Sequence, residues 1–374
     1  MLFFELIQVA LGRRQRLSLL PSASEWQHLF QLSMQHALLG ICYQGISSLP
    51  REQWPTEELL VDWIWQAQRI REQNELLSRR CVEVCRRLEG DGFNPCLLKG
   101  HSNARLYGAL SDLRQPGDID VWVTPKHFDS FRKARRQTIG YVRSSYPNAL
   151  LRYHHIEFPI FSDVEVELHF VPIYLNNPWL NHRLNRWYRA QHDRQMRHQV
   201  RLTDCEVAQP DAEFNLLYQL LHIYKHIFEE GIGLRQLMDY YFVLANDEFR
   251  PSAADIQHTN AMIRQLHLER LAGAVMYVLH EVMALPDERL LCPPRKDEGL
   301  ALLSEIMQSG NFGHFDSRGE NTDGGHDLRS QLHRYWRKTK RNIVLSYYYP
   351  YEGLCEPLFH LYHYLWQVLN LWKL

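Results

Sequence analysis

The sequence predicts an α+β fold, in which a small mixed sheet in residues 89–205 is flanked by helical regions in residues 1–88 and 206–374. Apolar residues at helical spacing dominate both ends of the chain, whereas short alternating segments occur only between them. The chain has 374 residues, of which 45% are hydrophobic and 23% charged. These values are typical of a globular protein with room for two or three structural units.

Two segments of the N-terminal region have clear helical patterns. In residues 22–39 the apolar residues recur at helical spacing. They are Trp26, Leu29, Phe30, Leu32, Met34 and Leu38. Residues 57–88 form a longer helical pattern that allows one break. It ends at Gly90-Asp91-Gly92, which is a good stop signal for a helix.

The central region begins with the apolar run Pro95-Cys96-Leu97-Leu98, which predicts a buried strand. A tight turn at Lys99-Gly100 and a helix in residues 101–110 follow. The next strand is predicted in residues 118–123, and its side chains alternate between two faces. Ile119, Val121 and Val123 lie on one face, and Asp118, Asp120 and Trp122 lie on the other.

Thr124-Pro125 predicts the start of a helix, because Thr is a good N-cap and Pro is favoured at the first helical position. We expect this helix to reach about residue 137 and to turn three side chains inward. These are Phe128, Phe131 and Ala134.

Residues 153–158 and 164–170 predict two strands, joined by a turn at Ser162-Asp163. The second segment alternates, with Glu165, Glu167 and His169 on one face and apolar residues on the other. His154 and His155 are consecutive, so only one of them is expected to face a given side of a regular strand. That one is a candidate for contact with the acidic side chains.

Residues 214–228 and 234–244 are the clearest helical segments of the C-terminal region. The Gly-, Asp- and Asn-rich residues 310–325 predict an exposed loop, and residues 333–341 predict a basic helix. Residues 358–374 predict a buried amphipathic helix, with a membrane-surface helix as the alternative. No run of about 18 apolar residues occurs, so no membrane span is predicted.

Charge and cysteine content limit the partners and the compartment. A formal net charge of −1 argues against a long nucleic acid as partner, although a local patch could still meet a nucleotide or a tRNA end. The seven cysteines are odd in number and form no paired CxxC motif, which predicts a reducing cytoplasm. The oligomeric state is left open.

Asp118 and Asp120 carry the predicted chemistry. Two Asp residues at i and i+2 on a strand project their carboxylates to the same side, where they can hold a hard divalent cation such as Mg²⁺ or Mn²⁺. A third carboxylate from a neighbouring strand could complete the metal site or act as the base. Glu165 and Glu167 share one face, and either could be that carboxylate.

The turn Lys99-Gly100-His101-Ser102 could supply a phosphate site. A glycine after a strand lets backbone N–H groups approach a phosphate closely. Lys99, Ser102 and Arg114 could add charge or hydrogen bonds to a triphosphate. The structural alternatives are that Lys99 is a solvated turn residue and that Arg114 only braces its loop.

These pieces are weak singly, but their order resembles the nucleotidyltransferase superfamily that includes the DNA polymerase beta-like enzymes. The nearest resemblance is to an uncharacterised bacterial nucleotidyltransferase family with a Lys-Gly, an Arg-x-x-Gly-Asp-Ile-Asp and a Glu-Leu-His motif. The matching segments are Leu98-Lys99-Gly100, Tyr107, Arg114-Gln115-Pro116-Gly117-Asp118-Ile119-Asp120, His154-His155-Ile156-Glu157-Phe158, Glu165-Val166-Glu167-Leu168-His169-Phe170, the helix with His222, His226, Arg235 and Asp239, and Gly310-Asn311-Phe312-Gly313. One departure is His101, where many superfamily members have a small residue.

The resemblance implies a nucleotidyltransferase core in residues 89–205 that moves a nucleoside monophosphate from a nucleoside triphosphate, such as ATP, to a hydroxyl group. It implies Asp118 and Asp120 as metal ligands and favours Glu167 over Glu165 as the third acid. The acceptor stays open among a small molecule, a sugar, a protein side chain and a tRNA. The alternative is a non-catalytic protein with a degenerate nucleotidyltransferase fold that binds a nucleotide or a partner.

Overall fold

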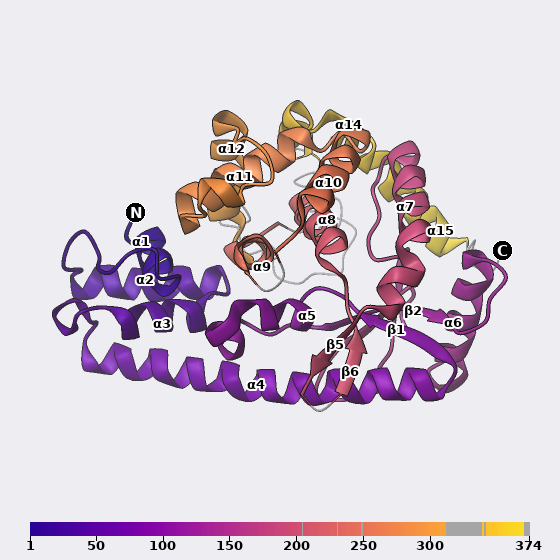
Figure 1. Ribbon diagram of the computed structural model, residues 1–374, viewed down its shortest axis with the longest axis horizontal. Coiled ribbons are helices and arrows are strands. Elements are labelled where there is room, and N and C mark those ends of the chain that lie inside the picture. The colour runs from indigo at the N-terminus through magenta and orange to yellow at the C-terminus, as the bar shows by residue number, and fades with distance from the viewer. Residues whose placement is uncertain (204, 230, 248–249, 312–338, 340–341, 370–374) are drawn as a thin grey trace.

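The structure, a computed structural model, describes residues 1–374 except residues 204, 230, 248–249, 312–338, 340–341 and 370–374. Helices, a central sheet and further helices follow one another along the chain, in the predicted order (Figure 1). The predicted loop in residues 310–325 and the predicted basic helix in residues 333–341 lie almost entirely outside the described residues.

The N-terminal region is helical, as predicted. Its elements are α1 (Leu2–Ala10), α2 (Ala23–Gln35), α3 (Leu39–Ser48), η1 (Arg51–Gln53) and α4 (Glu57–Gly90). Helix α2 begins at Ser22, whose Oγ accepts from the Glu25 amide at 3.3 Å while the Glu25 carboxylate accepts from the Ser22 amide at 2.7 Å. This capping box stabilises the first turn. Helix α4 is one unbroken helix of 34 residues that lies under most of the molecule (Figure 1).

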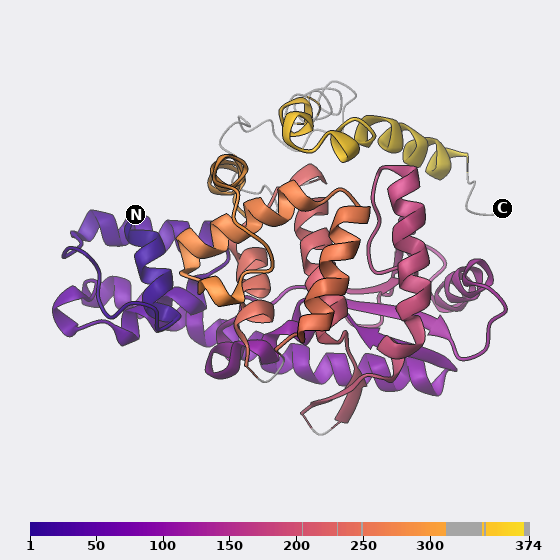
Figure 2. The same ribbon diagram turned by 45° about the horizontal axis from the view of Figure 1, so that its top comes forward.

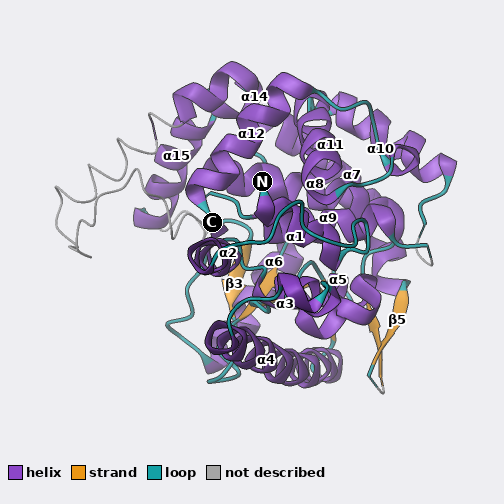
Figure 3. Cartoon of the chain, turned by 90° about the vertical axis from the view of Figure 1, so that its left-hand side faces the viewer, coloured by secondary structure: helices purple, strands orange, loops and turns teal. Residues whose placement is uncertain are grey.

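A six-stranded mixed sheet forms the centre of the fold, which confirms the predicted α+β class. Its strands are β1 (Phe93–Leu97), β2 (Ile119–Pro125), β3 (His155–Glu157), β4 (Val166–His169), β5 (Gln199–Leu202) and β6 (Cys205–Ala208). Their order is β3-β4-β2-β1-β6-β5, with β2 parallel to β4 and β1 parallel to β6. Strands β5 and β6 were not predicted. In Figure 3, β5 projects at one side of the molecule.

The alternation predicted for β2 and β4 is confirmed by the two cores on either side of the sheet. Val121 and Leu168 pack with Val84 of α4 and with Val142 of α6 (Phe131–Ser145). Trp122 faces the other way and joins the larger core formed by the helices. Asp120 and Glu167 alternate with Val121 and Leu168. They therefore point to the same face of the sheet as Trp122.

The helix predicted from Thr124-Pro125 to about residue 137 is wrong in both bounds, because α6 starts later and ends at Ser145. Thr124 and Pro125 still belong to β2, where they pair with Asn94 and Phe93 of β1. Pro125 has no N–H to donate, but the pairing of β2 with β1 closes just beyond it, where the Lys126 amide donates to the Gly92 carbonyl at 2.8 Å. Helix α6 begins later, after Ser130, whose Oγ accepts from the Lys133 amide. Its buried residues are Ala134, Thr138, Ile139 and Val142, and so of the predicted inner set only Ala134 is confirmed.

The helix predicted in residues 101–110 is broken. A single turn, α5 (His101–Ala104), runs into the 3₁₀ segment η2 (Arg105–Leu113). Within η2, Gly108 has φ 57° and ψ −122°, a conformation that interrupts any regular helix. The chain therefore winds compactly between β1 and β2 and does not form one straight helix.

The C-terminal region is a layer of helices on the face of the sheet opposite α4 (Figure 2). The layer also contains α7 (Pro178–Arg197) of the central region. The elements of the C-terminal region are α8 (Ala212–Glu229), α9 (Leu234–Ala245), α10 (Ala253–Gln265), α11 (Glu269–Met283), η3 (Asp287–Arg289), α12 (Lys296–Ser309), α14 (Pro350–Gly353) and α15 (Glu356–Val368). Helices α8 and α9 confirm the two predicted segments. None of the described helices is long and apolar enough to cross a membrane.

Helix α15 lies on the surface, so the predicted burial of residues 358–374 is wrong where the structure describes them. Leu358, Leu361 and Tyr364 are exposed, whereas Trp366 is buried. Trp366 packs against Tyr153 and the guanidinium of Arg135. The helix therefore rests on the rest of the molecule by one side only.

The two helical regions share one hydrophobic core. Phe3 and Leu6 of α1 belong to the same cluster as Val278 of α11. The Gln8 side chain also donates to the backbone carbonyls of Glu281 and Val282, at 3.3 and 3.2 Å. The division into residues 1–88, 89–205 and 206–374 stays a prediction, and its second boundary falls inside β6.

Candidate active site

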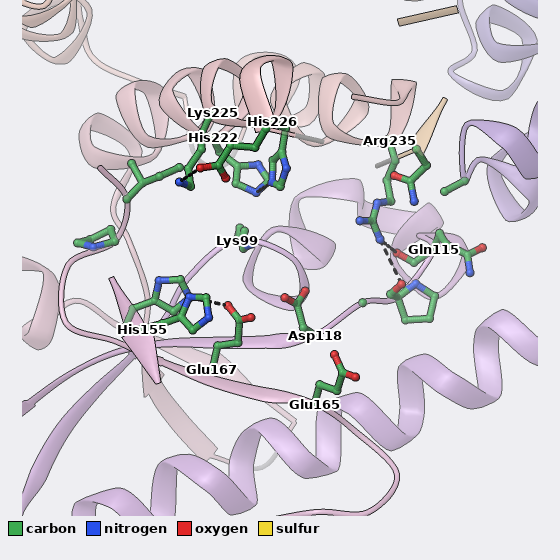
Figure 4. A pocket seen from close by; sticks show the side chains of 18 of the residues that line it. Lys99, Gln115, Asp118, His155, Glu165, Glu167, His222, Lys225, His226 and Arg235 are labelled. Carbon is green, nitrogen blue, oxygen red and sulfur yellow. Dashed lines mark hydrogen bonds and ion pairs between the residues drawn. The ribbon is translucent and has the colours of Figure 1, made fainter. Parts of the chain in front are cut away.

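A cavity of about 790 Å³ lies between the sheet and helices α8 and α9. We call its sheet side the acidic floor, formed by Asp118, Glu165 and Glu167. We call its helical side the basic wall, formed by His222, Lys225, His226 and Arg235. Figure 4 shows the floor and the wall facing each other, with Lys99 between them.

The parallel pairing of β2 and β4 builds the floor. Asp120 lies in register with Glu167, and the Ile119 amide donates to the Glu165 carbonyl at 2.9 Å. Neighbouring residues in register on adjacent strands project to the same face. The sheet therefore brings acidic residues together that lie more than forty positions apart in the sequence.

Asp120 lies beneath the cavity and is 3% exposed. One carboxylate oxygen is 3.2 Å from the Lys99 ammonium, and the other is 2.7 Å from His169 Nε2. Burial alone would raise the pKa of Asp120, but the charge of Lys99 and the hydrogen bond from His169 hold that pKa well below its usual value. Asp120 is thus ionised at neutral pH.

Lys99 and His169 are the cationic partners of this carboxylate. Burial would lower the pKa of Lys99, but the charges of Asp120, Asp118 and Glu167 raise it above its ordinary value. Burial opposes the charge on His169 as well, yet its hydrogen bonds to Asp120 and Glu167 raise its pKa to about 9. The floor therefore carries both signs of charge at pH 7.

The structure distinguishes the two candidate glutamates. Glu167 accepts from His169 at 3.2 Å and lies 3.3 Å from His155 Nδ1, whereas Glu165 is exposed at the rim. Burial raises the pKa of Glu167, and the hydrogen bond from His169 offsets this only in part. His169 thus holds Glu167 by a hydrogen bond, and the Glu165 carboxylate has no such contact with any residue that the structure describes.

Residues 22–284 match the family described as uncharacterised nucleotidyltransferases. That span covers more than half of the sequence. The chain belongs to this family. No curated protein matches the chain at a significant level. Among solved structures, an antigenic nucleotidyltransferase-like protein from Paracoccidioides brasiliensis is similar over 58% of this chain and 92% of its own, with 14% identity and a TM-score of 0.30. Similarity at that level supports no argument about this chain.

The donor atoms beside the cavity are of the kind that hold a divalent cation. One ligand atom each of Asp120, Glu167 and His169 lies within 4.8 Å of the others. Asp118 is outside this group but lines the cavity, and it makes no hydrogen bond or ion pair with any residue that the structure describes. Carboxylate oxygens are the ligands that Mg²⁺ and Mn²⁺ prefer.

The Lys-Gly turn has the conformation that needs glycine. Gly100 has φ +56° and ψ −111°, and the chain then enters the single turn of α5. Lys99 lines the cavity, but Ser102 is buried and borders a separate hollow beside Gln209. His101 turns to α4, where its Nε2 lies 2.8 Å from Ser78 Oγ. Its bulk is thus accommodated away from the cavity.

Arg114 does not line the cavity in the part of the chain that the structure describes. Its guanidinium binds both carboxylate oxygens of Asp239 on α9, at 2.7 and 2.8 Å, and Tyr107 donates to the same carboxylate at 2.6 Å. This buried, bidentate pair matches the alternative in which Arg114 braces its loop. Another arginine, Arg235, takes the place in the cavity that Arg114 was expected to fill.

The sequence predicted only part of the basic wall, namely the helices on which its residues lie. His222 and His226, four residues apart on α8, lie 2.9 Å apart at their Nε2 atoms. Lys225 pairs with Glu229 at 2.6 Å and lies over the ring of Tyr174. Helical periodicity placed these residues on a helix, but no local signal indicates which side of that helix meets the floor.

His154 and His155 both line the cavity, which contradicts the expectation that only one of them could. His154 precedes the first residue of β3, and so the strand alternation does not apply to it. Burial lowers the pKa of both residues, to about 2 for His155, with nearby positive charges adding to the effect. Both imidazoles are therefore neutral at pH 7.

Proposed function

We propose that this protein is a metal-dependent nucleotidyltransferase that moves a nucleoside monophosphate from a nucleoside triphosphate to the hydroxyl of an acceptor. The observation that carries the proposal is the convergence of Asp118, Glu167 and Lys99 on one cavity, opposite a basic wall. Its volume of about 790 Å³ lies within the range of ligand pockets for small molecules and cofactors.

In this proposal Asp118, Asp120 and Glu167 hold Mg²⁺ or Mn²⁺. The bound cation would neutralise charge on the phosphates and stabilise the pyrophosphate leaving group. Glu165 is the alternative third ligand, but its exposed position at the rim supports it less. Asp120 lies deepest, and Lys99 and His169 hold its carboxylate in one orientation.

Glu167 is the proposed base for the acceptor hydroxyl. A carboxylate whose pKa is raised by burial is a better proton acceptor at neutral pH than a fully solvated one. His169 and His155 both contact its Oε2 and fix its orientation. The proton would thus pass from the acceptor hydroxyl to Glu167 as the oxygen attacks the α-phosphate.

Lys99 and Arg235 are the proposed contacts of the triphosphate. Both line the cavity, on opposite sides of Asp118 in Figure 4, and both side chains are cationic. Arg114, Gly100 and Ser102 act in support, since Arg114 anchors the loop that leads to Asp118 and Gly100 forms the turn that presents Lys99.

The direct test is pyrophosphate release from each of the four ribonucleoside triphosphates with Mg²⁺ or Mn²⁺, followed by transfer of labelled nucleotide to components of a cell extract. Asp118→Asn and Glu167→Gln should lower turnover on the order of 10³-fold or more. The distant surface variant Asp62→Asn is the control that should retain turnover. Glu165→Gln decides between the two glutamates, because it should retain turnover when Glu167 is the third ligand. Near-normal turnover of Asp118→Asn would contradict the metal role of Asp118.

One observation favours a non-catalytic binder as the second candidate. Both oxygens of Asp120 are already engaged, by Lys99 and His169, in the way that an ion-paired structural residue would be. Calorimetric titration with ATP, with and without Mg²⁺, separates the candidates. Metal-independent binding without pyrophosphate release under any condition would favour the binder.

A further inference from the structure

Three imidazoles gather at one end of the acidic floor. We call His154, His155 and His169 the histidine cluster. One ring nitrogen of each lies within 4.8 Å of the others, and His155 Nδ1 is 3.4 Å from His154 Nε2. His155 and His169 are direct partners across the antiparallel strands β3 and β4. The backbone ladder therefore holds the cluster together.

Two nitrogens of the histidine cluster lack a partner. His154 Nδ1 and His169 Nδ1 are buried, and neither forms a hydrogen bond with any residue that the structure describes. His169 is only 2% exposed. A buried polar atom without a partner is costly, and in native structures it often marks a place where an ion or water binds.

Two carboxylates contact imidazoles of the histidine cluster. His169 Nε2 lies 2.7 Å from Asp120 Oδ1, and His155 Nδ1 lies 3.3 Å from Glu167 Oε2. A carboxylate that binds a ring nitrogen orients the imidazole. This arrangement surrounds most metal-binding histidines.

We propose that His154, His155 and His169 bind a transition-metal ion such as Zn²⁺, Co²⁺ or Mn²⁺, beside the carboxylates assigned above to the cation of the nucleotide. Imidazole nitrogens favour these ions over Mg²⁺ and Ca²⁺, which select oxygen ligands. Binding at His169 releases a proton, because only a deprotonated nitrogen is a ligand. The site needs no nucleotide, so it does not depend on the proposed transfer reaction.

The nearest cations do not exclude a metal ion from the cluster. Lys99 is paired with Asp120, and Lys225 is paired with Glu229. Asp118, Asp120 and Glu167 add negative charge on the same side of the cavity. The attraction of these carboxylates offsets the repulsion from the two ammonium groups.

His222 and His226 provide a matched control within the same cavity. They also bring two imidazoles together, at 2.9 Å, but they belong to no group of three potential ligands among the described residues. Their substitution removes imidazoles from the cavity without touching the histidine cluster.

The test is a titration of the full-length, chelator-treated protein with Co²⁺, followed by visible absorption. We expect a saturable site at one equivalent with the ligand-field bands of nitrogen coordination, displaced by Zn²⁺ but not by excess Mg²⁺. His154→Ala and His155→Ala should weaken Co²⁺ binding at least ~10-fold, since each removes a ligand. His222→Ala and His226→Ala should leave the affinity unchanged.

Absence of a saturable Co²⁺ site in the unaltered protein would overturn the inference, whatever the variants do. Equal affinity in the unaltered protein and both cluster variants would overturn it too. His154→Asn and circular dichroism check that a loss does not arise from misfolding. Asp118→Asn separates the two proposals, because it should abolish nucleotide transfer but preserve the Co²⁺ spectrum.

Discussion

Asp118 and Asp120 are two residues apart and have the same side chain, but their surroundings differ. Asp120 is buried and paired with Lys99 and His169, whereas Asp118 is half-buried and faces the cavity. One residue therefore contributes to the fold as well as to the proposed metal site, and the other contributes to the site alone. Substitutions of the two should separate stability from activity.

We expect Asp120→Asn to lower the free energy of unfolding by about 3–5 kcal/mol, because the buried His169 and the partly buried Lys99 lose the carboxylate that they share. Asp118→Asn should change it by no more than about 0.5 kcal/mol. Urea unfolding of both variants measures this, with the exposed Asp62→Asn as control. Equal losses for Asp118→Asn and Asp120→Asn would contradict the difference in environment described here.

A substitution at Gly100 tests the conformation of the turn that places Lys99 at the cavity. A Cβ at Gly100 would meet only the Asp118 carbonyl, at 3.7 Å, so space is available, but φ +56° with ψ −111° is strained for any other residue. Gly100→Ala should destabilise the protein by about 1–3 kcal/mol. Gly140 lies within α6 with open space around it, and Gly140→Ala should be stabilising by about 0.5–1 kcal/mol. Thermal unfolding of the pair provides the comparison, and a neutral Gly100→Ala would argue against this backbone conformation.

At the scale of elements, the loop before β2 is held from two helices. Asn74 of α4 donates to the carbonyl of Arg114 at 2.8 Å. Helix α9 supplies Asp239, which binds the Arg114 guanidinium, and Arg235, which donates to the carbonyls of Gln115 and Pro116. The position of Asp118 at the end of this loop therefore depends on how α9 packs.

We expect Arg114→Met alone to lower the free energy of unfolding by about 3–5 kcal/mol, because Asp239 is then a buried carboxylate without its main partner. The double variant Arg114→Met/Asp239→Leu should return to within about 2 kcal/mol of the unaltered protein, since neither charge is left unpaired. Denaturant unfolding in a double-mutant cycle measures the coupling. Additive losses would mean that the pair is not coupled.

At the scale of the whole molecule, segments from both ends of the chain pack against the middle of the chain. Helix α1 packs on α11, and Met34 and Leu39 of the N-terminal region reach the cavity. Near the other end, Glu352 of α14 accepts from the backbone amides of Asn176 and Asn177, which precede α7. The carboxylate thereby fastens the C-terminal segment to the central region.

Burial raises the pKa of Glu352 from its ordinary value of 4.5 to about 7, although the two amide hydrogen bonds oppose this. A folded-state pKa above the unfolded value means that the contribution of Glu352 to stability is present at low pH and is lost as pH rises from about 4.5 through 7. The loss is on the order of 3 kcal/mol. Measured by urea unfolding, the stability difference between the unaltered protein and Glu352→Gln should fall between pH 5 and pH 8. Parallel pH profiles of the two proteins would refute the assignment.

Several features of the protein follow from local sequence alone. Caps such as Ser22, the period of α4 and the alternation along β2 and β4 depend on residues within a few positions of one another. The same alternation predicted that Asp118 and Asp120 share a face of one strand and that Glu167 and His169 share a face of another. The α+β class and the succession of a helical region, a central sheet and a second helical region were therefore predictable.

Only the tertiary structure decided how distant segments meet. Thr124 and Pro125 extend β2 because β1 lies beside them, and local capping preference could not anticipate that partner. Arg114 binds Asp239, Arg235 enters the cavity, and His154 joins His155 because α9 and β3 pack where they do. A periodic pattern indicates which residues of an element share a face, but the element that covers that face is chosen by packing across the whole chain.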